Sequence, residues 1–317
     1  MLKFPRLLVL FLFAIQARAD LFLSGFSDNS IYRYDQGGAL MGGGAFIAAG
    51  SGGLSAPHRS FYGADGNLYV ASANTDSVLR YNGSTGAFID VFIQNGANGL
   101  PANALDYPVD MALGPDGALY VSSQLNDSVL RFNPATGAFL GTFVTGASAG
   151  LDGPSGISFH DGDLFVVGRF SNAVYRYDGT TGAPVGTGVF ATGLSQPFGI
   201  AFSPGGTALV ADGNTNSVLK FDGVSGASLG AFVSSGSGGL NFPIGVEYLQ
   251  GILYVASFND NRVIEFDGSS GIFQGNYVTS VTGVQGPNFM TFAVPEPGVF
   301  IALISGAALL LSRRHRR

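Results

Sequence analysis

A five-residue pattern, in which one charged residue stands between hydrophobic residues, occurs six times along the chain. Its copies are residues 30–34, 77–81, 128–132, 173–177, 217–221 and 262–266. Polar and hydrophobic alternation with β-branched and aromatic residues predicts a β-strand at each copy. The closing aromatic residues are 47, 51, 45, 44 and 45 positions apart, a period typical of four-stranded propeller blades.

Each copy of the pattern belongs to a longer unit with four predicted strands. The first strand is led by a proline, namely Pro57, Pro108, Pro154, Pro197 or Pro243. A tight turn such as Asp116-Gly117 suits a two-residue hairpin, and a second strand such as residues 68–72 follows. A turn rich in Asn and Asp then leads to the charged pattern, and a last turn leads to an outer strand such as residues 138–144.

The first unit has no proline-led strand before its second strand, residues 21–24. Residues 286–292 match the proline-led strands and have no further unit after them. We expect them to provide the inner strand of the first blade, which would then contain one C-terminal and three N-terminal strands. The sequence thus predicts an all-β, six-bladed propeller over residues 20–293, closed by pairing a C-terminal strand with the N-terminal blade and leaving no exposed sheet edges at the closure.

The N-terminal end has the three parts of a secretory signal peptide. Lys3 and Arg6 precede an apolar run at residues 7–15, and Ala17-Arg18-Ala19 provides a small-x-small cleavage site. We therefore predict a signal peptide at residues 1–19. An uncleaved anchor is the alternative, but the apolar run is shorter than the ~20 residues that a membrane span needs.

The C-terminal end, residues 294–317, combines a short motif, an apolar run and a basic cluster. Pro295-Glu296-Pro297 comes first, residues 299–311 are apolar, and the cluster contains Arg313, Arg314, Arg316 and Arg317. This order resembles the PEP-CTERM sorting signal of Gram-negative bacteria that make exopolysaccharide. The resemblance implies passage through the secretion translocon, transient inner-membrane anchoring, processing by an exosortase, and then release or surface attachment. A plain C-terminal anchor is the alternative.

The composition agrees with many short strands and limits the kinds of site and partner that the chain can have. Charged residues make up only 11% of the chain, whereas 49 of 317 residues are Gly. The absence of Cys excludes disulfides, thiolate metal sites and Cys nucleophiles. Residues 20–293 contain 8 basic and 20 acidic residues, a formal charge of −12, which argues against nucleic-acid binding.

The repeats resemble the NHL family of six-bladed propellers. Residues 153–157 read Gly-Pro-Ser-Gly-Ile, residues 208–212 read Ala-Leu-Val-Ala-Asp, and Asn216 and Phe221-Asp222 follow. Ser72 and Ser257 depart from the NHL pattern, because they occupy the place of Asp212 in other copies. The resemblance implies a fold, but not a function, because propellers have many unrelated functions.

Candidate binding residues are departures from the repeat near the expected channel. Arg59 and Asp110 stand where three other copies have Gly, and Glu247 stands where most copies have small residues. They could form a polar site at the channel mouth or a structural ion pair between blades. His58 begins the second blade's inner strand. Together with His160 it makes a poor metal constellation, because the two residues belong to different loop sets.

Oxygen-rich turns are a second candidate site. They are residues 74–76, 126–127, 214–216 and 259–261. Such turns can hold Ca²⁺ or another divalent ion, although Asx turns explain them without a metal. The divalent-metal set of regucalcin-like propellers and the His and Glu set of streptogramin lyase-like propellers do not map onto this chain.

Charged residues of the pattern look like an anion-binding ring: Arg33, Arg80, Arg131, Arg176, Lys220 and Glu265. The last is acidic and the third strand lies far from the axis, which favours solvated blade edges. Two functions are consistent with the sequence. The favoured one is an exported, non-catalytic binding or structural module for exopolysaccharide or surface proteins, and the alternative is a secreted metal-dependent hydrolase or lyase with a site at the channel mouth.

Overall fold

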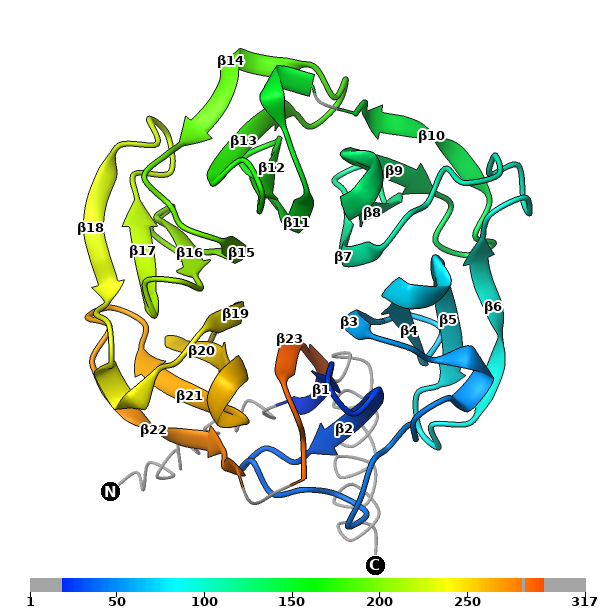
Figure 1. The fold of residues 1–317 in the computed structure, drawn as a ribbon, viewed down its shortest axis with the longest axis horizontal. Helices are drawn as coiled ribbons and strands as arrows, with labels where there is room; N and C mark the ends of the chain where they lie inside the picture. Colours follow the sequence, from blue (N-terminus) through cyan, green and yellow to red (C-terminus); the bar gives the residue numbers. More distant parts are fainter. Residues whose placement is uncertain (1–18, 147, 281–282, 294–317) are drawn as a thin grey trace, which may run out of the picture.

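A computed structural model describes residues 19–146, 148–280 and 283–293. Six antiparallel sheets stand around a central axis, one per predicted unit (Figure 1). The all-β, six-bladed propeller predicted from the period is confirmed. The predicted signal peptide and the sorting tail lie outside the described residues, apart from Ala19 at the start.

The inner strands begin with the prolines that the sequence analysis identified. They are β3 (Pro57–Tyr62), β7 (Pro108–Leu113), β11 (Pro154–His160), β15 (Pro197–Phe202), β19 (Pro243–Leu249) and β23 (Pro287–Ala293). Proline suits the first residue of a strand, where no ladder bond needs its missing N–H. Successive inner strands contact one another around the axis (Figure 1).

The second and third strands of each blade also fall where the pattern predicts them. The second strands are β1 (Asp20–Gly25), β4 (Asn67–Ser72), β8 (Leu119–Ser123), β12 (Asp163–Gly168), β16 (Ala208–Asp212) and β20 (Ile252–Ser257). The third strands are β2 (Ser30–Tyr34), β5 (Ser77–Asn82), β9 (Ser128–Phe132), β13 (Ala173–Asp178), β17 (Ser217–Phe221) and β21 (Arg262–Asp267). All six copies of the charged pattern are therefore third strands.

Five blades have a fourth, outer strand, which lies at the rim of the ring (Figure 1). These strands are β6 (Phe88–Gln94), β10 (Phe139–Val144), β14 (Pro184–Ala191), β18 (Ser228–Val233) and β22 (Phe273–Val278). In the first blade the prediction of three N-terminal strands is wrong. Residues after β2 form only isolated bridges, Tyr34 with Leu40 and Ile31 with Ile47, because Gly42 and Gly43 between them adopt positive φ values and glycine weakens a strand.

The C-terminal strand pairs with the N-terminal blade, as the sequence predicts. β23 runs antiparallel to β1, with Leu21 opposite Phe292 and Leu23 opposite Met290. The first sheet therefore has the order β2-β1-β23. Neighbouring sheets are not joined to each other by strand pairing, so contacts between blades must come from side chains and turns.

A hydrogen bond from a turn to the next blade recurs six times around the ring. In each blade the residue before the third strand adopts a positive φ, and its side-chain oxygen accepts a backbone N–H from the residue before the next inner strand, at 2.6 to 2.9 Å. The accepting residues, here called the blade clamps, are Asn29, Asp76, Asp127, Asn172, Asn216 and Asn261. Asn and Asp tolerate this conformation better than other side chains, so the clamps explain why the turns are rich in both.

Apolar side chains fill the space between neighbouring blades. Tyr69 and Phe92 of one blade, for example, share a buried cluster with Leu119 and Phe132 of the next. Burial of each large side chain contributes about 1.5 to 3 kcal/mol. The sheets are therefore held as a ring by packing and by the clamps.

The charged residues of the third strands are ion-paired more often than the solvated interpretation implies. Arg33 pairs with Asp20 at 2.7 Å and Arg176 pairs with Asp163 at 2.6 Å. Arg80 and Arg131 contact Asp90 and Asp116, respectively. Four of the six residues thus have partners on adjacent strands or turns, which rules out a shared anion ring. No helix within the described ranges is both long enough and apolar enough to cross a bilayer.

Candidate functional site

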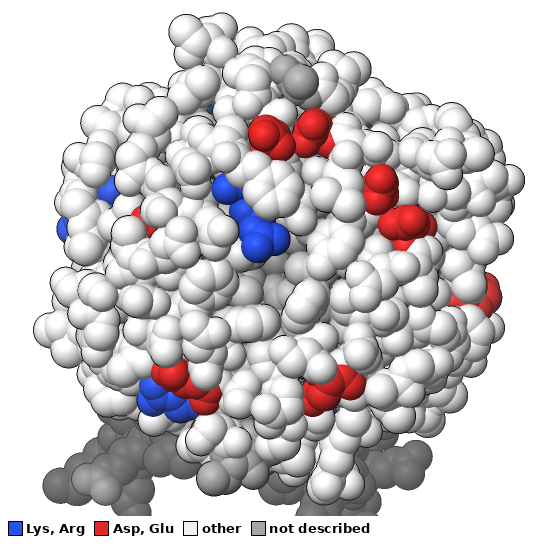
Figure 2. Space-filling model, in the orientation of Figure 1, with Lys and Arg blue, Asp and Glu red and all other residues white. Residues whose placement is uncertain are grey.

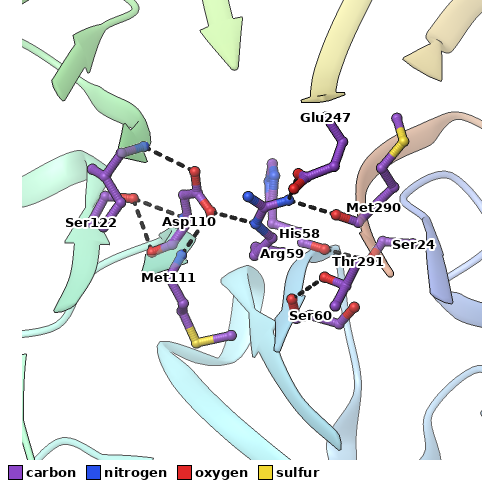
Figure 3. A network of polar contacts seen from close by, with 11 residues as sticks. Ser24, His58, Arg59, Ser60, Asp110, Met111, Ser122, Glu247, Met290 and Thr291 are labelled. Atoms are coloured by element: carbon purple, nitrogen blue, oxygen red, sulfur yellow. Dashed lines mark hydrogen bonds and ion pairs between the residues drawn. The ribbon is translucent and has the colours of Figure 1, made fainter. Parts of the chain in front are cut away.

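Arg59 crosses the central channel and joins four blades. Its Nε donates to Asp110 Oδ1 at 2.9 Å, and its Nη1 donates to Glu247 Oε2 at 3.1 Å and to the carbonyl oxygen of Met290 at 2.5 Å. Figure 3 shows the guanidinium lying between the two carboxylates. Arg59, Asp110, Glu247 and Met290 belong to β3, β7, β19 and β23. The ion pair between neighbouring blades is therefore present, and it extends to the far side of the channel.

Asp110 is held by backbone groups as well as by Arg59. Its Oδ1 accepts the N–H of Met111 at 2.8 Å and its Oδ2 accepts that of Ile157, in the next blade, at 2.9 Å. Burial raises the pKa of the Asp110 carboxyl, and Arg59 together with these two N–H groups opposes that rise. Burial disfavours the charge of Arg59 too, but the two carboxylates outweigh it and raise the pKa of the guanidinium.

Glu247 has a different environment on the other side of Arg59. Burial raises the pKa of its carboxyl and Arg59 opposes that rise, but 33% of its side chain remains exposed. It lines a cavity of about 130 Å³ together with Ser60, Met111, Thr291 and other residues. Beside Arg59 the channel thus contains a small space lined by one partly exposed carboxylate.

Glycines at the same position of other inner strands explain why Arg59 and Asp110 are unusual. A Cβ on Gly199 would lie 2.6 Å from the carbonyl oxygen of Ile244, and one on Gly245 would lie 2.5 Å from that of Asn288. Blades four to six therefore need glycine there, because their inner strands approach closely. Around β3 and β7 the same position holds larger side chains, and Arg59 occupies the space between the strands.

His58 lies in the channel on the side where the inner strands begin, which we call the mouth. It is 4% exposed, and its Nδ1 accepts a hydrogen bond from Asn288 Nδ2 at 2.8 Å. Burial and the charge of Arg169 lower the pKa of His58 to about 3. The imidazole is therefore neutral with its proton on Nε2, which is buried and has no hydrogen-bond partner. All four candidate residues from the sequence line the channel, but His58 is separate from the Arg59 network.

Two rings of side chains surround the mouth. The outer ring, formed by the residue after each second strand, contains Phe26, Ala73, Gln124, Arg169, Gly213 and Phe258. The inner ring, formed by the second residue of each inner strand, contains His58, Val109, Ser155, Phe198, Ile244 and Asn288. Val109, Phe198 and Ile244 pack in one cluster, so the inner ring converges on the axis. On the face in view in Figure 2, basic atoms lie beside a hollow near the centre, whereas the acidic side chains and the other basic ones lie farther out.

Arg169 is the residue at the mouth that the sequence analysis missed. Its guanidinium carbon lies 4.4 Å from the ring centroid of Phe198 and 5.4 Å from that of Phe170. Burial lowers its pKa, and its Nε is buried without a hydrogen-bond partner. When the residues that follow the six second strands are aligned, Arg169 is the one charged residue among them. The sequence therefore contained a signal that could have identified it.

The oxygen-rich turns are used for blade contacts. Their last residues are blade clamps, and other members bond within or beside the turn, as Asn74 does to Ser55. Within the part of the chain that the structure describes, no three His, Asp or Glu side chains lie close enough together to hold a metal ion. His160 stacks on Phe202, with ring centroids 4.1 Å apart, and is not near His58 in the fold, because it ends β11 and lies away from the mouth.

The serines that depart from the NHL pattern keep the role of the aspartate. Asp212 accepts the backbone N–H of Ser195 at 2.7 Å. Ser72 and Ser257 accept the corresponding N–H groups of Ser55 and Asn241, each at 3.0 Å. These substitutions therefore preserve a local hydrogen bond and are no sign of a site.

No family model matches the chain, and no curated protein matches it. Among solved structures, the propeller is similar to one in a crystal structure of a nidogen/laminin complex, with a TM-score of 0.68 and 16% identity over 87% of this chain and 98% of that one. It is also similar to a catalytically inactive variant of virginiamycin B lyase from Staphylococcus aureus with quinupristin, with a TM-score of 0.56 and 18% identity over 76% of this chain and 75% of that one. A streptogramin B lyase structure has a TM-score of 0.54 and 12% identity over 82% and 74% of the two chains. These similarities show the fold alone, and the six-bladed propeller has both binding and lyase neighbours.

Proposed function

We propose that this chain is an exported propeller that acts as a non-catalytic binding or structural module at the cell surface or in the extracellular matrix. One observation carries the proposal: Arg59 engages both carboxylates that the enzyme alternative would use, Asp110 and Glu247. A carboxylate bound to a fixed guanidinium is a poor general base and a poor metal ligand, because either role must first break the ion pair. The binding-module neighbour in the nidogen/laminin complex is consistent with this proposal.

The cellular location of the protein is part of the same proposal. The order of Pro295-Glu296-Pro297, an apolar run and four arginines supports sorting through a PEP-CTERM tail by an exosortase, after passage through the secretion translocon. The chain would be anchored transiently in the inner membrane of an exopolysaccharide-producing Gram-negative bacterium. Its partners would then be exopolysaccharide or surface proteins.

A binding screen tests the function. The purified chain is screened against glycans and extracellular proteins, with hydrolytic and lyase activities measured in parallel. We expect a saturable partner and no turnover. A turnover that Glu247→Gln abolishes, while the fold is retained, would replace the proposal with the metal-dependent hydrolase or lyase.

Substitution of the Pro-Glu-Pro motif in the tail tests the proposed sorting to the cell surface. Changing Pro295, Glu296 and Pro297 to alanine should leave a longer, membrane-retained species in the native host, detected by immunoblotting of fractions. The matched control changes the exposed loop residue Pro204 to alanine and should be processed normally. Unaltered processing and release of the tail variant would remove the sorting interpretation.

A further inference from the structure

The mouth of the channel has one positive charge that forms no ion pair within the described residues. Residues 20–293 contain eight basic residues. Six of them form ion pairs: Arg33, Arg59, Arg80, Arg131, Arg176 and Arg262. Lys220 and Arg169 have no such partner in the described part of the chain, and of these two only Arg169 stands at the mouth.

The unbalanced charge is accompanied by unpaired hydrogen-bond donors. Buried polar atoms without a partner include Nε of Arg169, Nε2 of His58 and Oγ of Ser155. Nδ1 of His58 lies 2.8 Å from Nδ2 of Asn288 and accepts from it in the tautomer that carries the proton on Nε2, which is then a donor. Oδ1 of Asn288, in the same inner ring, is an acceptor that also has no partner. Ser155 is fully buried and has the same register position as His58 in the inner ring. A buried donor without an acceptor costs free energy, so this cluster suits a ligand that supplies acceptors.

These groups stand together at one end of the channel. The rings of His58 and Tyr107 are 5.5 Å apart at their centroids. Tyr107 packs against the cluster that contains Phe198, the ring over which Arg169 lies. Neither ring of the mouth contains an acidic residue. The walls are aromatic and apolar, with Phe26 5.3 Å from His58 between ring centroids and Phe198 under Arg169.

We propose that the mouth is a binding subsite for a single carboxylate group, held by Arg169 with His58 and Ser155 as additional donors. Arginine is suited to a carboxylate because its donors form a planar fork. The aromatic wall suits a flat apolar or sugar face beside that carboxylate. Polyanions fit poorly, because the body of the propeller carries a formal charge of −12 and repels further negative charge.

This subsite rests on the proposed binding function, whose partner it would contact. Its test uses small probes, so the two can fail separately. If no probe binds, the macromolecular screen can still find a partner, and if the screen finds no partner, binding of the probes can still be measured.

The experiment titrates the purified full chain with sodium benzoate and with sodium glucuronate, using calorimetry. Benzyl alcohol and glucose are the neutral counterparts. We expect at least one carboxylate to bind and its neutral counterpart not to bind, and the preferred probe distinguishes an aromatic from a sugar scaffold. Arg169→Gln should weaken binding about tenfold or more, since a charge-assisted bond is lost. Arg169→Lys should have an intermediate effect, and Lys220→Gln, which removes an unpaired charge elsewhere, should have none.

Two results would overturn the subsite. One is the absence of binding by either carboxylate up to about 10 mM, a Kd weaker than a useful subsite. The other is equal affinity in the wild type and Arg169→Gln. Thermal unfolding checks that the variants fold. If Arg169→Gln does not, undiminished binding in both Arg169→Lys and Ser155→Ala overturns the proposal.

Discussion

Removal of the Arg59 guanidinium should destabilise the propeller strongly. Arg59→Met keeps most of the apolar stem and deletes the groups that bind Asp110, Glu247 and the carbonyl oxygen of Met290. Asp110, whose side chain is 3% exposed, would then be a buried carboxylate without a cation. The four blades joined by Arg59 would lose their polar contact across the channel.

The magnitude follows from how exposed each partner is. Removal of one partner of a buried pair costs about 3 to 5 kcal/mol, but two backbone N–H groups still stabilise Asp110, which favours the lower limit. Glu247, with a side chain 33% exposed, adds at most about 1 kcal/mol. We expect a loss of about 3 kcal/mol in the free energy of unfolding at pH 7.

Urea unfolding of the purified variants measures this loss. Arg80→Met is the matched control, because the Arg80 and Asp90 side chains are 23% and 45% exposed and their pair should contribute about 1 kcal/mol or less. Without Arg59 the pKa of both channel carboxyls rises further, so the folded variant takes up protons more readily than its unfolded chain. The deficit should therefore shrink as the pH falls from 7 towards about 4. A loss equal to that of the control, or one independent of pH, would refute this account of the channel.

Three further substitutions test the ring and the mouth. Asn216→Ala removes a blade clamp and should cost about 1 to 3 kcal/mol in urea unfolding, whereas the exposed Asn214→Ala on the same turn should cost little; equal costs would contradict the clamp. Gly199→Ala places a Cβ 2.6 Å from a neighbouring carbonyl oxygen and should destabilise by more than about 2 kcal/mol, while Gly44→Ala, in open space, should be tolerated; a stable Gly199 variant would show that the inner strands can separate. His58 is neutral when folded and takes up a proton when unfolded below its ordinary pKa, so it should reduce stability as the pH falls from about 6.5, by up to ~1.4 kcal/mol per pH unit. His58→Phe should remove that contribution to the slope. An unchanged slope would mean that His58 takes up its proton at the same pH in the folded and unfolded chains.

The sequence was sufficient for the architecture because each strand has a local signal. Proline at the start of β3, β7 and β11, and the charged pattern in β5 and β9, recur at one period. The one strand that was predicted wrongly, the outer strand of the first blade, lies where glycines interrupt that signal. The pairing of β23 with β1 could be predicted because an inner strand was missing at one end and surplus at the other.

The channel was only partly predictable. Comparison of the copies identified Arg59, Asp110, Glu247 and His58 as departures from the repeat. An alignment of repeats shows that a residue type is unusual at its position, but it does not show what the side chain contacts. The sequence could not show that Arg59 reaches Glu247, four blades later in the chain, because that contact depends on how the ring closes. It could not show that His58 is neutral either, because burial lowers its pKa.

The sequence by itself determined the number of blades, their strand order and the departures from the repeat, since these follow from local pattern and period. Only the tertiary structure decided which of the residues that depart from the repeat contact one another. Arg59 is engaged by two carboxylates from other blades, whereas Arg169 faces the mouth without one. The reason is geometric: the inner strands bring positions far apart in sequence to one axis, and there the pairing of charges depends on side-chain reach across the channel and not on sequence distance.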